Sequence, residues 1–95
     1  MNKYEIALVV SSKIDDEART ATLDRVKKRV EKSGSTIIDV DEKGKQRLAY
    51  EIQDMKEGYY YFVHFEGPVE APAKIENKLR ITESVIRYLI VRQDA

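Results

Sequence analysis

Apolar residues along this chain recur with two different periods, which divide it into strands and helices. Alternating or continuous apolar runs predict β-strands over residues 4–10, 36–40 with 47–52, 57–65 and 85–91. Apolar residues spaced three or four apart predict helices in residues 15–33 and in a shorter segment around Pro72. The order along the chain is therefore strand, helix, strand, strand, helix, strand.

Both helical segments carry the expected termini. Acidic residues begin the segment 15–33 and basic residues end it, as the helix dipole favours, and Gly34 suits the left-handed residue that ends many helices. In the shorter helix, Pro72 fits the first turn, where its missing N–H is not needed. The apolar stripes of the two helices are Leu23, Val26 and Val30, and Ile75 and Leu79.

The second strand is interrupted and then resumes. Residues 41–44 are polar apart from Gly44, at which we expect a β-bulge. Residues 54–58 are expected to form a polar turn. The strand that follows would then pair antiparallel with the strand before it.

This order of elements is the split βαβ arrangement of ferredoxin-like folds. A chain of 95 residues fits one domain. We therefore expect a single α+β domain over residues 1–95, with a four-stranded antiparallel sheet and both helices packed on one of its faces. The other face of the sheet is left open.

Alternation along the aromatic strand predicts which side chains face the helices. Tyr61, Val63 and Phe65 form the set that stays apolar to the end of the strand, so we place them in the core with Ile6, Leu8 and Tyr88. The opposite parity is also unusually apolar for a solvated face, and such a surface on a small protein is typical of a partner site, although strands also carry stray apolar residues. The residues of this open face are Ala7, Val9, Tyr60, Phe62, Leu89 and Val91.

The stretch EGYYYFVHF at residues 57–65 nearly matches the strand with which RNA-recognition modules stack bases. That motif has a basic residue where Glu57 stands and a small residue where Tyr60 stands. It also needs the aromatic rings of Tyr59 and Tyr61 to face outward, whereas the alternation turns them toward the helices. Residue identity and parity both argue against a free-standing single-strand RNA binder.

Composition limits the chemistry that the chain can perform. Cysteine is absent and His64 is the one histidine, so we expect no disulfide, no metal site and no cofactor. No Gly-rich phosphate loop precedes either helix, and no apolar run approaches the ~20 residues of a membrane-spanning helix. We therefore expect no catalytic residues, no small-molecule substrate and no membrane contact. A small-molecule regulatory domain of the same fold remains an alternative, although it would need a polar pocket that the sequence does not indicate.

The net charge of the chain argues neither for nor against a nucleic-acid partner, because 17 basic residues balance 17 acidic ones. Basic residues nevertheless recur at the ends of elements, where they could grip phosphates by position. Lys43, Lys45 and Arg47 cluster around the interruption at Gly44, and Lys78 and Arg80 end the short helix. Arg87 and Arg92 lie in or just after the last strand.

Several motifs, taken together, resemble the protein six family of the bacterial small ribosomal subunit over essentially the whole chain. The agreement is strongest for RLAYEI at residues 47–52 followed by EGYY at 57–60. It extends to KYEI at 3–6, LRITE at 79–83 and VIRYLIVR at 85–92. The resemblance implies a ferredoxin-like, non-catalytic protein of the cytoplasmic ribosome. It further implies binding to the central domain of small-subunit ribosomal RNA as a heterodimer with small-subunit protein eighteen.

The resemblance and the patterns above together give two sets of expected site residues. The expected RNA-binding residues are Lys3, Tyr4, Lys45, Arg47, Arg80, Arg87 and Arg92. The expected partner-protein residues are Leu48, Ala49, Tyr50, Tyr60, Phe62, Leu89 and Val91. Two positions depart from the family's pattern: Gln46 stands where Arg is common, and Lys43 where a bulky apolar residue is common.

Overall fold

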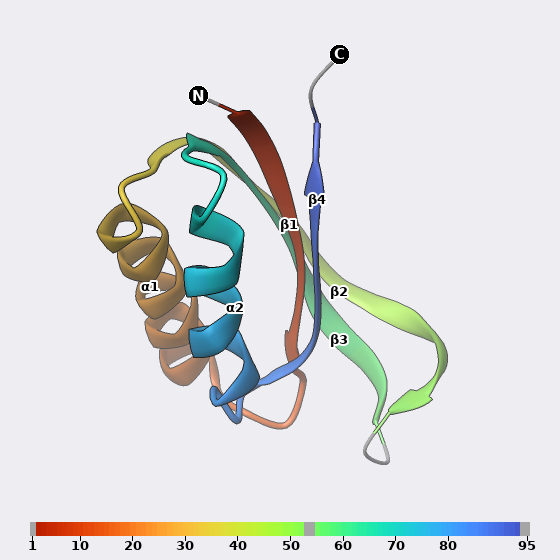
Figure 1. The fold of residues 1–95 in the computed structure, drawn as a ribbon. Coiled ribbons are helices and arrows are strands. Elements are labelled where there is room, and N and C mark those ends of the chain that lie inside the picture. The colour runs from red at the N-terminus through yellow and green to blue at the C-terminus, as the bar shows by residue number, and fades with distance from the viewer. Residues whose placement is uncertain (1, 53–54, 94–95) are drawn as a thin grey trace.

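The computed structural model describes residues 2–52 and 55–93, with the side chains of residues 2–48 and 56–93. Its elements follow the predicted order along the chain (Figure 1). They are β1 (Asn2–Ser11), α1 (Asp16–Lys32), β2 (Thr36–Ile52), β3 (Met55–Gly67), α2 (Ala71–Arg80) and β4 (Val85–Arg92).

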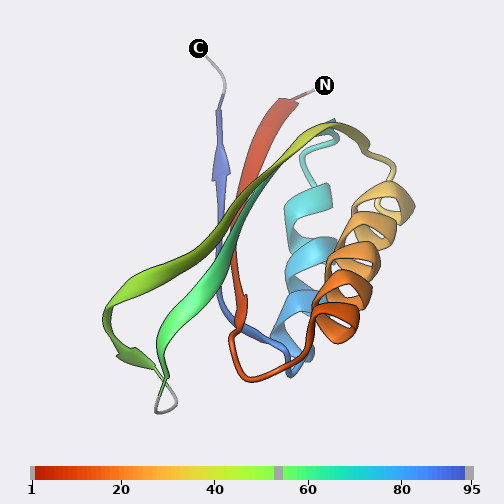
Figure 2. The ribbon, with the colours of Figure 1, turned by 180° about the vertical axis from the view of Figure 1, so that it is seen from behind.

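The four strands form one antiparallel sheet in the order β2-β3-β1-β4. Both helices lie side by side against one face of this sheet, and the other face is free of helices (Figures 1 and 2). The predicted split βαβ fold is therefore confirmed.

The core lies between the sheet and the helices, on the face that the alternation predicts. Tyr61, Val63 and Phe65 are at most 4% exposed and pack in one cluster with the helix residues Ile75 and Leu79. Burial of each such side chain contributes roughly 1.5–3 kcal/mol.

The residues that flank α1 account for where the helix begins and ends. Asp15 is the N-cap, and its Oδ1 accepts a hydrogen bond of 2.8 Å from the N–H of Ala18. After the helix, Gly34 has a φ of 87°, the left-handed conformation expected from the sequence. Pro72 occupies the first turn of α2, as predicted.

The hairpin of β2 and β3 differs from the prediction in two ways. The polar residues 41–44 do not break β2, because the ladder continues through a register shift between Glu42 and Gly44, where Gly44 has a φ of 77°. The predicted bulge is thus present without a break. The predicted turn at 54–58 is wrong for its later part, since Met55 already begins β3. The hairpin bends away from the helices toward the open face of the sheet (Figures 1 and 2).

Two phenylalanines of β3, three residues apart, test the assignment of the faces. Phe65 is fully buried and its ring stacks on Tyr4 with centroids 5.3 Å apart, whereas Phe62 is half-buried on the open face. We expect Phe65→Ala to lower the free energy of unfolding by roughly 3–5 kcal/mol. Phe62→Ala should cost clearly less, and urea unfolding of both variants measures the difference. Equal losses would contradict the assignment.

Candidate functional site

The open face of the sheet is organised in rows of residues that cross the strands. In one row Ala7 pairs with Phe62 on β3 and with Leu89 on β4. In the next row Val9 pairs with Tyr60 and Arg87. On β3, β1 and β4 the two central rows are therefore apolar apart from Arg87, whereas on β2 the residue paired with Phe62 is Asp41.

These rows enclose a shallow hollow of about 260 Å³. Leu89 on its rim is 60% exposed, and Val91, farther along β4, is 38% exposed. The apolar surface is thus most open along β4, which is an edge strand of the sheet. The lining residues are Ala7, Val9, Tyr60, Phe62, Arg87, Tyr88 and Leu89.

Toward the hairpin the open face covers itself, which corrects the expectation of a wholly bare surface. Val9 and Leu48 are only 6% and 9% exposed, and they pack together with Tyr60 and Ile86 in a second apolar cluster. Gly58 permits this approach, because a Cβ at that position would lie 2.6 Å from Cγ1 of Val9. Leu48 therefore serves the chain's own packing and offers little surface to a partner.

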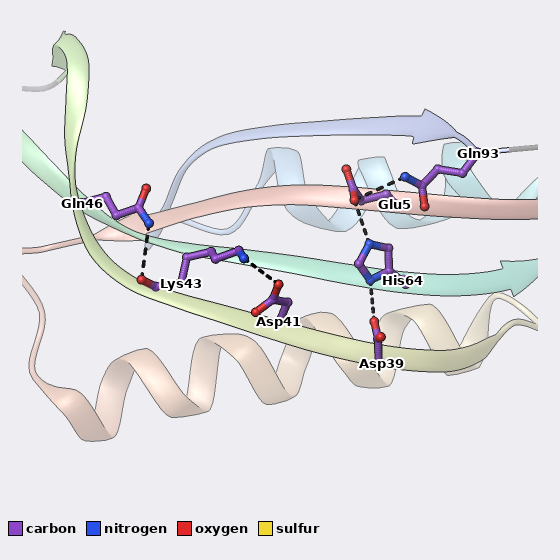
Figure 3. A network of polar contacts seen from close by, with 7 residues as sticks. All are labelled: Glu5, Asp39, Asp41, Lys43, Gln46, His64 and Gln93. Atoms are coloured by element: carbon purple, nitrogen blue, oxygen red, sulfur yellow. Dashed lines mark hydrogen bonds and ion pairs between the residues drawn. The ribbon is translucent and has the colours of Figure 1, made fainter.

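A polar row borders the apolar rows at the other end of the open face (Figure 3). His64 lies between two carboxylates: its Nδ1 bonds to Oδ1 of Asp39, and its Nε2 lies 2.7 Å from Oε2 of Glu5. The side-chain amide of Gln93 donates to the same Glu5 oxygen at 3.3 Å. These polar contacts thus join β2, β3, β1 and the residue that follows β4, while the β4 residue opposite Glu5 is the apolar Val91.

The two carboxylates change the charge state of His64. Hydrogen bonding to Asp39 is the largest cause that raises the pKa of His64, and Glu5 adds to it, while burial acts in the opposite direction. Sequence reasoning named His64 but missed both carboxylate partners. The antiparallel register that pairs His64 with Glu5 and Asp39 is the signal that would have found them.

The two positions that depart from the family's pattern are engaged within the hairpin (Figure 3). Lys43 Nζ lies 2.9 Å from Oδ2 of Asp41, and the amide of Gln46 donates to the carbonyl oxygen of Lys43 at 3.4 Å. Both side chains therefore support the polar surface of the bulged segment.

The predicted RNA-binding cations do not gather in one place. Lys3 and Arg87 are exposed on the open face, because Lys3 precedes Glu5 and Ala7 at alternate positions and Arg87 pairs with Val9. They lie toward opposite ends of that face. The apolar hollow and the polar row separate them.

The remaining predicted cations lie elsewhere. Arg92 has the parity of the helix side, and its Nη2 donates to Oδ1 of Asn2 at 2.8 Å. Arg80 ends α2, where its Nη2 lies 3.6 Å from Oε1 of Glu76. The two predicted cations on the hairpin, Lys45 and Arg47, are exposed.

The remaining predicted site residues are Tyr4, Ala49 and Tyr50. Tyr4 is 5% exposed with its ring stacked on Phe65, so it serves the core and we leave it out of the RNA-binding set. The side chains of Ala49 and Tyr50 lie outside the described residues. The described partner residues that remain exposed or half-buried are Tyr60, Phe62, Leu89 and Val91.

The aromatic strand does not present its rings as a base-stacking surface. Tyr61 is 4% exposed, and the guanidinium of Arg19 lies 3.9 Å from the ring centroid of Tyr59. The parity expected from the sequence is therefore confirmed. Both rings that an RNA-recognition strand would expose are covered by the chain itself.

Two classes of site are absent from the described part of the chain. In residues 2–52 and 55–93, no group of three or more His, Cys, Asp or Glu side chains could hold a metal ion. Within the same ranges, no helix is long and apolar enough to cross a membrane.

Comparison with known proteins gives a consistent result. Residues 3–92 match the family model described as ribosomal protein S6. The small ribosomal subunit protein bS6 of Alkaliphilus oremlandii is 41% identical over 92 residues, which cover 97% of each chain. The protein of the same name from Clostridium botulinum (strain Loch Maree) is 37% identical over 94 residues, covering 99% of this chain and all of the other.

A solved structure agrees with the sequence matches. The crystal structure of 30S ribosomal protein S6 from Thermotoga maritima has a TM-score of 0.93 and 29% sequence identity. The match covers 97% of this chain and 87% of that chain.

The raised pKa of His64 makes stability depend on pH in a defined direction. A pKa that is higher in the folded than in the unfolded chain contributes stability below the unfolded value and loses it as pH rises through the folded value. We expect wild type to exceed His64→Gln in free energy of unfolding at about pH 6, and the gap to shrink by about pH 9. Urea unfolding at both pH values measures it.

Asp39→Asn is the matched variant, because it removes the larger of the two raising interactions and keeps the histidine. An NMR titration should show a lower pKa for His64 in this variant than in wild type. A stability difference between wild type and His64→Gln that does not change with pH would contradict the role of the carboxylates.

Proposed function

We propose that this chain, which belongs to the ribosomal protein S6 family, is a non-catalytic structural component of the small ribosomal subunit, as the members of that family are proteins of this subunit. In this role it binds small-subunit ribosomal RNA jointly with small-subunit protein eighteen. Its place is then the ribosome of the bacterial cytoplasm. The RNA it binds is the central domain, which forms the platform of the subunit. The observation that carries the proposal is the exposed apolar surface beside Arg87 on the open face.

The apolar hollow along β4 is the proposed contact surface for protein eighteen. Leu89 is 60% exposed at its rim, and Phe62 and Tyr60 form its half-buried floor. Burial of such a surface by a partner removes apolar area from water, which is the main favourable term in association. The polar row around His64 would form the rim on one side, where hydrogen bonds set orientation.

The charge of the chain explains why the partner and the RNA bind together. Seventeen basic and seventeen acidic residues cancel, and the exposed cations of the proposed RNA-binding set are dispersed over the surface. Affinity for RNA grows with the number of phosphates that a protein neutralises at once. A partner that brings its own cations beside Arg87 would complete a footprint that this chain supplies only in part.

The joint footprint predicts that the isolated chain binds weakly. In a gel-shift titration with central-domain RNA at physiological salt, we expect wild type alone to bind far more weakly than its mixture with protein eighteen, by roughly a hundredfold or more. Tight binding by the isolated chain would refute the joint footprint.

The partner surface can be tested at one exposed side chain. Leu89→Glu places a charge in the hollow without disturbing the core, so we expect affinity for protein eighteen to fall by roughly ten- to hundredfold in calorimetry. Val69→Glu is the matched control, because Val69 is 69% exposed in the segment before α2. The same loss in both variants, or in neither, would argue against this surface.

A further inference from the structure

The helical layer carries a second concentration of charge, away from the open face. A groove of about 230 Å³ lies between α1 and α2. The side of α1 that contacts the sheet is apolar, with Leu23, Val26 and Val30 buried, so this groove opens on a different side of the helix. All five residues that line the groove are basic: Arg25, Lys28, Arg29, Lys32 and Lys78.

Spacing brings the cations of the groove together. The four from α1 fall at i, i+3, i+4 and i+7, so they share one side of the helix over about 10 Å. Lys78 faces them from α2, and the guanidinium Nε of Arg29 donates to the carbonyl oxygen of Lys74 at 3.1 Å. That hydrogen bond ties the two helices together at the groove.

The charges of the groove are not neutralised by the chain itself. Within the described part of the chain, none of the five cations forms an ion pair, whereas Arg19 and Arg80 both do. Like charges one helical turn apart destabilise a helix by a few tenths of a kcal/mol per pair. A cluster that costs stability and whose described cations form no ion pair within the chain favours a role in binding an external anion.

The helix dipole accounts for only part of the cluster. Arg29 and Lys32 lie in the last turn of α1, where cations complement the partial negative charge of the helix end. That effect is confined to the last turn, so it gives no reason for Arg25 and Lys28, which lie before it.

The shape of the groove indicates the kind of anion. Its volume is below the roughly 300–1,000 Å³ of pockets that enclose a whole small-molecule ligand. A neighbouring hollow of about 330 Å³ shares Arg25 and Lys78 with it and adds the apolar Ile81 and the polar residues Thr82, Glu83 and Ser84. Apart from Glu83 and Ile81, the residues that line the two hollows are cationic or bear a hydroxyl group. Such a lining suits successive phosphates of a backbone better than one enclosed molecule.

We propose that the groove between α1 and α2 binds the phosphate backbone of a second segment of ribosomal RNA, on the side of the chain remote from the protein-eighteen surface. This inference rests on the proposed function, which supplies the RNA. The contacts would position the chain without reading base sequence, because lysine and arginine grip phosphates by charge. The chain would then be held between two RNA segments.

Two triple variants of equal net charge test the groove. Lys28, Lys32 and Lys78 are changed to Gln together, leaving Arg29 and its hydrogen bond to Lys74 in place. The control changes Lys13, Lys27 and Lys56 to Gln, which lie outside the groove and outside the proposed RNA-binding set. Each variant is mixed with protein eighteen, and affinity for central-domain RNA is measured over a range of salt concentrations.

We expect the groove variant to bind roughly tenfold or more weakly than the control. The slope of log affinity against log salt should be smaller by about one for each phosphate that the variant no longer neutralises. Urea unfolding should show the groove variant to be at least as stable as the control, since like-charge repulsion is relieved.

Equal RNA affinity and equal salt slopes for the two variants would overturn the proposal that the groove binds RNA. The same result is expected if the groove binds an acidic protein segment instead. The proposed function is judged separately by Leu89→Glu, which lies on the opposite face. If Leu89→Glu lowers affinity for protein eighteen while the groove variant binds RNA as its control does, only the proposal about the groove fails. If the wild-type pair does not bind the RNA at all, both proposals fail.

Discussion

Strict alternation along the two central strands, β1 and β3, is the constraint on which the rest of the structure depends. Each strand sends one set of side chains into the dry layer beneath the helices and the other set to the open face. A slip of one residue would bring Glu5 and His64 into that layer, where charged groups are costly to bury. The polar side chains of the open face therefore fix the register of the strands. The same register places the apolar core residues beneath the helices and the open-face residues toward a partner.

Rows on the open face follow from that register. Glu5, His64 and Asp39 meet because their strands are paired at those positions, and the apolar row beside them has the same origin. Polar and apolar rows side by side on one face give a partner both apolar area to bury and hydrogen bonds that set its orientation. The open face thus acquires its chemistry from sheet geometry, with no loop needed to assemble it.

The same alternation explains which features could be predicted from the sequence. The faces of Tyr61 and Phe65, the end of α1 at Gly34 and the bulge at Gly44 each depend on local patterns of a few residues, and each was predicted correctly. The burial of Leu48 could not be predicted, because it depends on how far the bulged hairpin bends over Val9. The partners of His64 likewise require the register of three strands. Tyr4 shows two patterns in conflict, since its position beside a basic residue suggested RNA contact while its own parity placed it in the core, where it lies.

A chain with no net charge can still bind a polyanion if like charges gather locally, and in this fold five cations gather at the groove between the helices. Acidic residues such as Asp39 and Asp41 lie on the hairpin, where Lys43 and His64 pair with them. The helical layer holds five cations around one groove with no carboxylate among its lining residues. Because the screening length at physiological salt is about 8 Å, a phosphate at the groove responds to the nearest charges and little to the total. Local arrangement decides the electrostatics of this protein, and the two faces of the fold offer chemically different surfaces, one apolar and hydrogen-bonding and the other cationic.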